Sequence, residues 1–152
     1  MKTASATPAA GLAMAADSKP ALVTEIKRLN LRHTWTTTMS SSQYRDTLHT
    51  AYTRDGITGH GEGAPIVRYH EDAAGAKKTA DAVRDYVLSA NPMQFGKFMA
   101  QVFQRVPGGW AGKAAVDIAL MDWVGQKLGI PLYSYFGLDP NDTPLTTFSI
   151  GI

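Results

Sequence analysis

The side chains with the clearest chemical potential are two histidines and a glutamate in a predicted hairpin. Asp55-Gly56 lies between two strand-like runs, which is a strong signal for a two-residue turn. Counting outward from that turn places His49 opposite Glu62, with His60 on the same face as Glu62. Two imidazoles and a carboxylate can bind a divalent metal. Because the pattern offers no fourth ligand or base, we interpret the group as a cross-strand ion pair beside a neighbouring histidine.

A second candidate is the stretch GHGEGA at residues 59–64, which satisfies the G-x-G-x-x-A pattern of dinucleotide-binding sites. That pattern works when the glycine turn leads directly into a helix whose N-terminus faces the pyrophosphate. Here Pro65 and a polar stretch delay the next helix to about residue 72, and Glu62 would place a carboxylate against the phosphates. The pattern therefore argues against a nucleotide site.

Asp117 and Asp122 lie in an otherwise apolar helix predicted over residues 110–128. At about 100° per residue, their spacing separates them by about 140°, so they do not form a paired-carboxylate site. A buried carboxylate needs a hydrogen bond or an ion pair. We therefore expect each aspartate to tie this helix to a neighbouring element rather than to act as a general acid.

Hydroxyl groups are concentrated in the loop Thr36–Ser42. No His/Asp pair accompanies them at a recognisable spacing, and no G-x-S-x-G elbow is present, so the sequence does not favour a serine or threonine nucleophile. A loop of this kind is either a solvated connection or a recognition loop, and the residues alone leave both interpretations open.

The composition fits one ordinary soluble domain, with 152 residues of which 44% are apolar. A formal charge of +2, spread among acids, excludes a nucleic-acid footprint. The absence of cysteine excludes disulfides, thiolate nucleophiles and cysteine-ligated zinc. No apolar run approaches the roughly 20 residues that cross a bilayer, so we expect no membrane partner.

Residues 1–20 differ from the rest, because Ala, Ser, Thr and Pro dominate them. We interpret them as a disordered leader or the remnant of a signal peptide, since Ala13-Met14-Ala15 has the form of a signal-peptidase site. The location of the protein stays open between the cytoplasm and, if residues 1–16 are the remnant of an export signal, the periplasm.

Three segments have the mixture of β-branched and polar residues that is typical of half-buried strands, residues 22–35, 46–53 and 57–62. They predict an antiparallel meander.

Helical periodicity follows, with apolar residues at steps of three and four. The first helix begins near Glu71 and presents one apolar face, made of Ala73, Ala76, Ala80, Val83 and Val87. Asn91-Pro92 predicts the N-cap and first position of a second helix, which Pro107-Gly108-Gly109 ends. The third helix spans residues 110–128 and stops at Gly129.

Two features at the C-terminal end lack partners in this prediction. Apolar residues surround most of helix 110–128, and a helix without a polar face is buried on several sides. Residues 147–152 alternate like a buried strand. The meander and the other helices cover neither, so we expect further polypeptide beyond this sequence.

Two longer stretches, GITGHGEGAPIVRYHE and GGWAGKAAVDIALMDWVGQKLGIPLYSYFG, carry a family resemblance. Together they resemble the muconate-lactonizing/mandelate-racemase branch of the enolase superfamily over about residues 22–152. The ending TTFSIGI is similar to the first barrel strand of the dipeptide epimerases in that branch.

The resemblance implies an α+β fold in which residues 21–143 form an enolase-like N-terminal cap domain. This domain is a three-stranded antiparallel meander followed by a helical bundle, and it includes the linking helix 110–128. Residues 144–152 would be the first strand of a (β/α) barrel that is otherwise absent.

The resemblance also implies an enzyme, an isomerase that transfers a proton at the α-carbon of a dipeptide with Mg²⁺. In the family, the Mg²⁺ ligands and the acid and base lysines lie on later barrel strands, so we expect them beyond Ile152 and this chain alone to be inactive. The complete enzyme would bind a small dipeptide and form a homo-oligomer. Alternatives are a muconate cycloisomerase or o-succinylbenzoate synthase-like member, or a stand-alone binding module.

In such enzymes the loops that correspond to residues 36–42 and 64–69 close over the barrel mouth and select the substrate. The implied substrate contacts here are Thr38, Ser40, Arg68 and Ser149. Some epimerases hold the distal carboxylate with an arginine in the first loop, where this sequence has Ser40 or a neighbour, which argues against an Ala-Glu substrate. Arg68 in the second loop could replace that charge.

Overall fold

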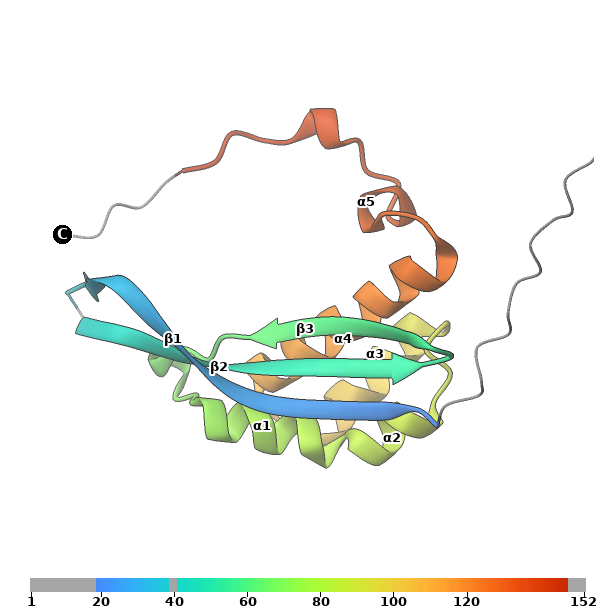
Figure 1. Ribbon diagram of the computed structural model, residues 1–152, viewed down its shortest axis with the longest axis horizontal. Helices are drawn as coiled ribbons and strands as arrows, with labels where there is room; N and C mark the ends of the chain where they lie inside the picture. Colours follow the sequence, from blue (N-terminus) through green and yellow to red (C-terminus); the bar gives the residue numbers. More distant parts are fainter. Residues whose placement is uncertain (1–18, 39–40, 148–152) are drawn as a thin grey trace, which may run out of the picture.

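The computed structural model describes residues 19–38 and 41–147. Three antiparallel strands form one sheet in the order β1-β2-β3, with β1 at Ala21–Thr36, β2 at Ser41–Arg54 and β3 at Ile57–Gly63. The helices follow in sequence, and in the view of Figure 1 those up to residue 128 lie behind or below the sheet, whereas the last two lie above it. They are η1 Val67–Tyr69, α1 Ala73–Ala82, α2 Arg84–Ser89, α3 Phe95–Arg105, α4 Trp110–Leu128, α5 Leu132–Tyr135 and η2 Pro140–Asp142.

The turn between β2 and β3 is the predicted two-residue hairpin. Asp55 and Gly56 both have left-handed backbones, with φ values of 52° and 74°, as a turn that follows the twist of the strands requires. Arg54 pairs with Ile57, and His49 lies opposite Glu62, so the predicted register is confirmed.

The hairpin of β1 and β2 is longer than predicted. β2 begins at Ser41 instead of Asp46, and Ser41 pairs with Thr36 across the strands. The two ends of the predicted hydroxyl loop, Thr36 and residues 41–42, are therefore strand, in a two-stranded arm that projects beyond β3 (Figure 1). The register shifts between Asn30 and Trp35. Such a bulge increases the local twist of an arm that has no third strand beside it.

α4 packs directly against the backbone of β3. Gly59, Gly61 and Gly63 alternate along the strand, and a β-carbon on any of them would overlap with backbone atoms of α4. The obstructing carbonyl oxygens belong to alanines at every fourth position, Ala111, Ala115 and Ala119. Two strand residues advance about 6.6 Å and four helix residues about 6.0 Å, so the contact can repeat three times. The glycines of GHGEGA therefore serve helix packing.

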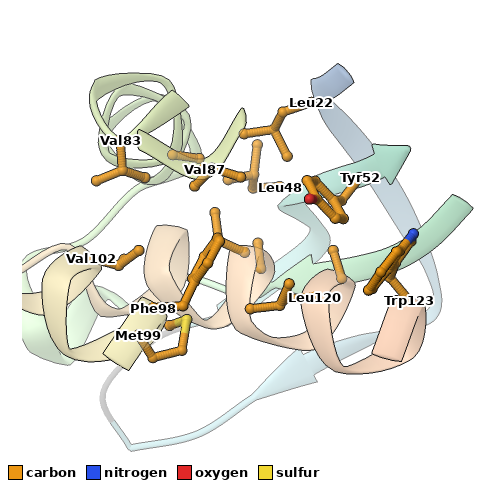
Figure 2. Packing of buried hydrophobic residues seen from close by; sticks show 14 of the residues in the cluster. Leu22, Leu48, Tyr52, Val83, Val87, Phe98, Met99, Val102, Leu120 and Trp123 are labelled. Atoms are coloured by element: carbon orange, nitrogen blue, oxygen red, sulfur yellow. The ribbon is translucent and has the colours of Figure 1, made fainter. Parts of the chain in front are cut away.

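The core lies between the sheet and the helices. Its largest fully buried side chains include Tyr52 from β2, Phe98 from α3 and Trp123 from α4 (Figure 2). The rings of Tyr52 and Trp123 meet edge to face, with centroids 6.0 Å apart. Trp123 Nε1 also donates to the carbonyl oxygen of Arg54 at 2.9 Å. This hydrogen bond holds the C-terminal end of β2 against the C-terminal part of α4.

The helix boundaries differ from the prediction in two places. The first predicted helix is broken at Val83, which separates α1 from α2. The next helix, α3, begins at Phe95 instead of Pro92, because the side chain of Asn91 accepts from the N–H of Met93 in a local turn. α4 has the predicted bounds, and Gly129 ends it with a φ of 67°.

The C-terminal segment adds little to the core. Residues 144–147 form no regular element. The rest of the predicted barrel strand, residues 148–152, lies outside the described residues, so that strand stays a prediction. Among the described helices, none combines the length and apolarity needed to span a bilayer.

Asp81 on α1 fastens the helices to the edge of β1. Its carboxylate accepts from Thr24 Oγ1 at 2.8 Å and from Lys77 Nζ at 2.6 Å, and it also binds the guanidinium of Arg84. Arg84 donates in turn to the carbonyl oxygen of Leu22. Burial raises the pKa of Asp81, but the hydrogen bonds from its three partners outweigh burial and hold the pKa below its usual value.

The glycine contact predicts the effect of adding one methyl group. Gly61→Ala should lower the free energy of unfolding by about 3 kcal/mol or more, because the backbone of α4 must move to admit it. Gly96→Ala is the matched control, since nothing lies within 4 Å of that position in α3. Urea denaturation measures both. A Gly61→Ala protein as stable as Gly96→Ala would contradict the contact.

The Asp81 cluster predicts a pH dependence. Because the folded state lowers the pKa of Asp81, the unfolded state binds more protons below about pH 5, and stability is lost as the pH falls through the folded pKa. Asp81→Asn should therefore destabilise the protein at pH 7 and have a much smaller effect at pH 3. Urea midpoints at the two pH values test this. Asp85→Asn, an exposed neighbour on α2, should show no such difference.

Candidate functional site

The histidine and glutamate group lies on the face of the sheet opposite the helices. His49 Nε2 is 3.9 Å from Glu62 Oε1, and Glu25 on β1 flanks His49 from the other side. His60 is two pairs further along, opposite Ala51. This is the geometry of the predicted cross-strand ion pair. Within residues 19–38 and 41–147, no three His, Asp or Glu side chains are arranged to hold a metal ion.

The two aspartates of α4 have different environments. Asp122 Oδ2 accepts from the backbone N–H of His60 at 2.8 Å and from Gln126 Nε2 at 3.1 Å, so it ties α4 to β3 as predicted. Asp117 is half-buried and makes no hydrogen bond with the residues that the structure describes. Its burial raises the pKa of the carboxyl group. The predicted tie is therefore not found for Asp117 among the described residues and stays a prediction there.

A hollow of about 600 Å³ lies between the β1–β2 arm and the loop that follows β3. The structure thus brings together the two segments that the sequence predicts to contact substrate. The lining residues are Thr37, Ser41, Ser42, Arg45, Pro65, Ile66, Val67, Arg68 and His70. We call this hollow the arm pocket.

The predicted contact residues have different outcomes. Arg68 is exposed and lines the arm pocket. Thr38 lies in an exposed bend of the chain and is not among the lining residues. Ser40 and Ser149 lie outside the described residues, so their roles stay predictions.

Sequence reasoning missed two basic residues of the arm pocket. Arg45 is on β2, one residue before the predicted start of that strand at Asp46. His70 follows η1 and has a left-handed backbone, with φ 57° and ψ 35°. Histidine is one of the residue types enriched in that conformation. The available signal for Arg45 was its place in the strand pattern, two residues before the buried Thr47.

One wall of the arm pocket is the loop that follows β3, and two carboxylates fix the C-terminal end of this loop. Glu71 Oε1 accepts from the first N–H groups of α4, those of Trp110 at 2.5 Å and Ala111 at 3.4 Å. Asp72 caps α1 by accepting from the N–H of Gly75 at 2.7 Å. Free N–H groups at a helix start attract carboxylates, so both helices fix the end of this loop.

The strand wall is held by an ion pair on the arm. Arg28 donates two hydrogen bonds of 2.8 Å to Asp46, and its guanidinium lies 3.8 Å from the centroid of the Tyr44 ring. The hydrogen bond between Arg28 and Asp46 raises the pKa of Arg28 and lowers that of Asp46. This pair joins β1 to β2 where no third strand supports them.

Comparison with known proteins identifies the domain. A family model described as Mandelate racemase / muconate lactonizing enzyme, N-terminal domain, matches residues 21–137. The chain belongs to this family. The resemblance predicted from the sequence is therefore confirmed, and so is the α+β fold of an enolase-type cap domain.

Curated relatives of this cap domain are dipeptide epimerases. The chain is 35% identical over 130 residues to an L-Ala-D/L-Glu epimerase of Bacteroides thetaiotaomicron, covering 82% of this chain and 32% of the relative. It is 31% identical over 130 residues to a hydrophobic dipeptide epimerase of Enterococcus faecalis, covering 82% of this chain and 36% of the relative. The chain thus spans about a third of the length of the curated relatives it matches.

Solved structures of dipeptide epimerases also match this chain. A dipeptide epimerase from Enterococcus faecalis V583, complexed with Mg and L-Leu-L-Tyr, matches with a TM-score of 0.72 and 27% identity, over 75% of this chain and 33% of that one. A dipeptide epimerase from Cytophaga hutchinsonii, complexed with Mg and D-Ala-L-Val, has a TM-score of 0.80 at 17% identity, over 86% and 36% of the two chains. At that identity the second match shows the fold alone.

Removal of the Glu71 carboxylate should loosen the arm pocket loop. We expect Glu71→Ala to lower the free energy of unfolding by about 1–3 kcal/mol, because two helix N–H groups lose their acceptor. Amide hydrogen exchange should also accelerate at Trp110 and Ala111. Glu25→Ala, whose side chain is 64% exposed, should change stability by about 0.5 kcal/mol or less. Equal effects of the two variants would contradict the anchoring role.

Proposed function

We propose that this chain is the cap portion of a Mg²⁺-dependent dipeptide epimerase and that its arm pocket contacts the part of the substrate distal to the reacting carbon. The observation that carries the proposal is a pocket built from the two predicted specificity segments, in a domain whose relatives are dipeptide epimerases.

The cap portion would orient the dipeptide and keep water from it. Holding a substrate in one geometry and excluding solvent are contributions that a domain can make without supplying the catalytic acid or base. The arm pocket suits this role because it combines polar side chains with the apolar Pro65, Ile66 and Val67. In the family, Mg²⁺ supplies charge stabilisation for the deprotonated substrate.

The residues described here do not fit a Mg²⁺ site. No group of three carboxylate or imidazole side chains in residues 19–38 and 41–147 is arranged to ligate a metal. We therefore derive no catalytic step through the metal, and we assign proton transfer to polypeptide that follows this region in the longer enzyme.

Exposed apolar side chains on the outward side of α4 are an argument for a second domain in that enzyme. Trp110, Ile118 and Leu128 are 57%, 49% and 41% exposed, although α4 packs its other side into the core. The half-buried Asp117 lies on the same helix without a partner among the described residues. An exposed apolar stripe of this kind is typical of an interface. We propose that the barrel domain covers it. Homo-oligomer formation and cellular location stay predictions.

The proposal predicts activity only with further polypeptide. A protein extended by the coding sequence downstream of residue 152 should exchange the α-proton of at least one dipeptide with solvent D₂O in the presence of Mg²⁺, because the barrel would supply the acid, the base and the metal ligands. The signal is loss of the α-proton resonance in NMR, and chelation by EDTA should abolish it. The 152-residue chain should show no exchange.

Two results would contradict the proposal. One is an extended protein that folds, binds Mg²⁺ and exchanges no proton in a panel of acidic, hydrophobic and basic dipeptides. The other is Mg²⁺-dependent exchange by the 152-residue chain alone, which would contradict the assignment of proton transfer to the later polypeptide.

A further inference from the structure

One carboxylate lies within the apolar outward side of α4. Asp117 is seven residues after Trp110 and eleven before Leu128, which is about two and three helical turns, so the three residues lie in one line along the helix. Trp110 and Leu128 are exposed, whereas the cap domain itself half-buries Asp117. Any surface that covers the two apolar side chains therefore also covers the carboxylate between them.

The described part of the chain gives this carboxylate no partner. Asp117 makes no hydrogen bond and no ion pair with residues 19–38 or 41–147, and burial alone acts on the pKa of its carboxyl group, which it raises. Asp122 on the same helix accepts instead from the N–H of His60 at 2.8 Å and from Gln126 at 3.1 Å. The packing of the cap domain thus uses one aspartate of α4 and leaves the other unused.

Lys113 has the spacing of a helical partner for Asp117 but points elsewhere. It precedes Asp117 by four residues, as in helical ion pairs, although an acid that follows its base is the weaker order. Lys113 Nζ lies 4.8 Å from the ring centroid of Phe103 and 4.9 Å from that of Trp110. Helical side chains lean toward the N-terminus, so this ammonium reaches back over the aromatic rings and away from Asp117.

Covering α4 changes the surroundings of the carboxylate. Water solvates the exposed part of Asp117 in the 152-residue chain. When another surface covers the apolar stripe, that water leaves, and an ionised carboxylate without a hydrogen bond or a cation is then strongly unfavourable. The curated relatives extend far beyond the cap domain, which spans about a third of their length, so the covering surface belongs to the rest of such an enzyme.

We propose that the barrel domain presents a hydrogen-bond donor to Asp117 and that this contact fixes the position of α4 on the barrel. The inference rests on the proposed function and names the chemistry of the partner, a cationic side chain or a neutral N–H or O–H group. Apolar side chains tolerate sliding against each other, whereas a buried hydrogen bond has one geometry. A single polar contact in an apolar interface therefore sets the register of the two surfaces.

One substitution should have opposite effects in two proteins. In the 152-residue chain, Asp117→Asn removes a charge that folding half-buries without a partner, so amide hydrogen exchange along α4 should slow. In the protein extended downstream of residue 152, the same change removes a charge-assisted hydrogen bond, and exchange along α4 should accelerate about tenfold. Asp85→Asn, an exposed aspartate of α2, should have little effect in either protein.

Two results would overturn the inference directly. Slower exchange in both proteins would mean that the barrel offers Asp117 no donor. Faster exchange in both would place the partner within the 152 residues. Preserved amide spectra in each variant show that it is folded.

Further variants identify the donor in the extended protein. If Lys113→Met abolishes the effect of Asp117→Asn, Lys113 is the partner and the inference fails. Asp117→Ala separates the two kinds of barrel donor. The amide oxygen of asparagine still accepts from a neutral N–H or O–H group, so a larger loss in Asp117→Ala indicates such a donor, and an equal loss indicates a cation.

The extended protein also separates this inference from the proposed function. If it exchanges the α-proton of no dipeptide but Asp117→Asn has opposite effects in the two proteins, the proposed function fails and the interface contact stands. If it is a Mg²⁺-dependent epimerase in which Asp117→Asn slows amide exchange as it does in the 152-residue chain, the proposed function stands and the inference fails.

Discussion

The close approach of α4 to β3 sets the position of the loop that forms one wall of the arm pocket. Gly63, the last residue of β3, lies against Ala111 in the first turn of α4. Glu71, at the other end of the loop, binds the N–H groups of that same turn. Both ends of the segment 64–71 are therefore fixed at the first turn of α4. A side chain in place of Gly63 would push α4 away and separate the two anchors.

The helices also close the edges of a sheet that has only three strands. At the edge of β3, Asp122 accepts from the N–H of His60 and Gln126 donates to the carbonyl oxygen of Thr58. At the edge of β1, Arg84 binds the carbonyl oxygen of Leu22. Unpaired backbone groups at a sheet edge can pair with a strand of another chain. The side chains of Asp122, Gln126 and Arg84 occupy such groups where the sheet packs on the core. The β1–β2 arm extends beyond these contacts.

The sequence predicted the features that depend on local rules. Asp55 and Gly56 adopt the left-handed backbone that a two-residue turn needs, and the turn sets the register of β2 and β3. Gly129 adopts the same left-handed backbone and ends α4. Periodicity does not reveal the break at Val83, a residue buried in the core, or the local turn at Asn91 that delays the start of α3. Arg45 was missed because β2 begins at Ser41, five residues before the start that the pattern predicted.

The placement of the arm pocket has an evolutionary consequence. Its basic residues are exposed, and the fully buried side chains come from elsewhere in the chain, so folding and ligand choice draw on separate sets of positions. Surface substitutions of this kind usually change stability little. Substitutions in the pocket can therefore change the ligand that it accepts at little cost in stability, whereas substitution of a glycine of β3 would disturb the packing of α4.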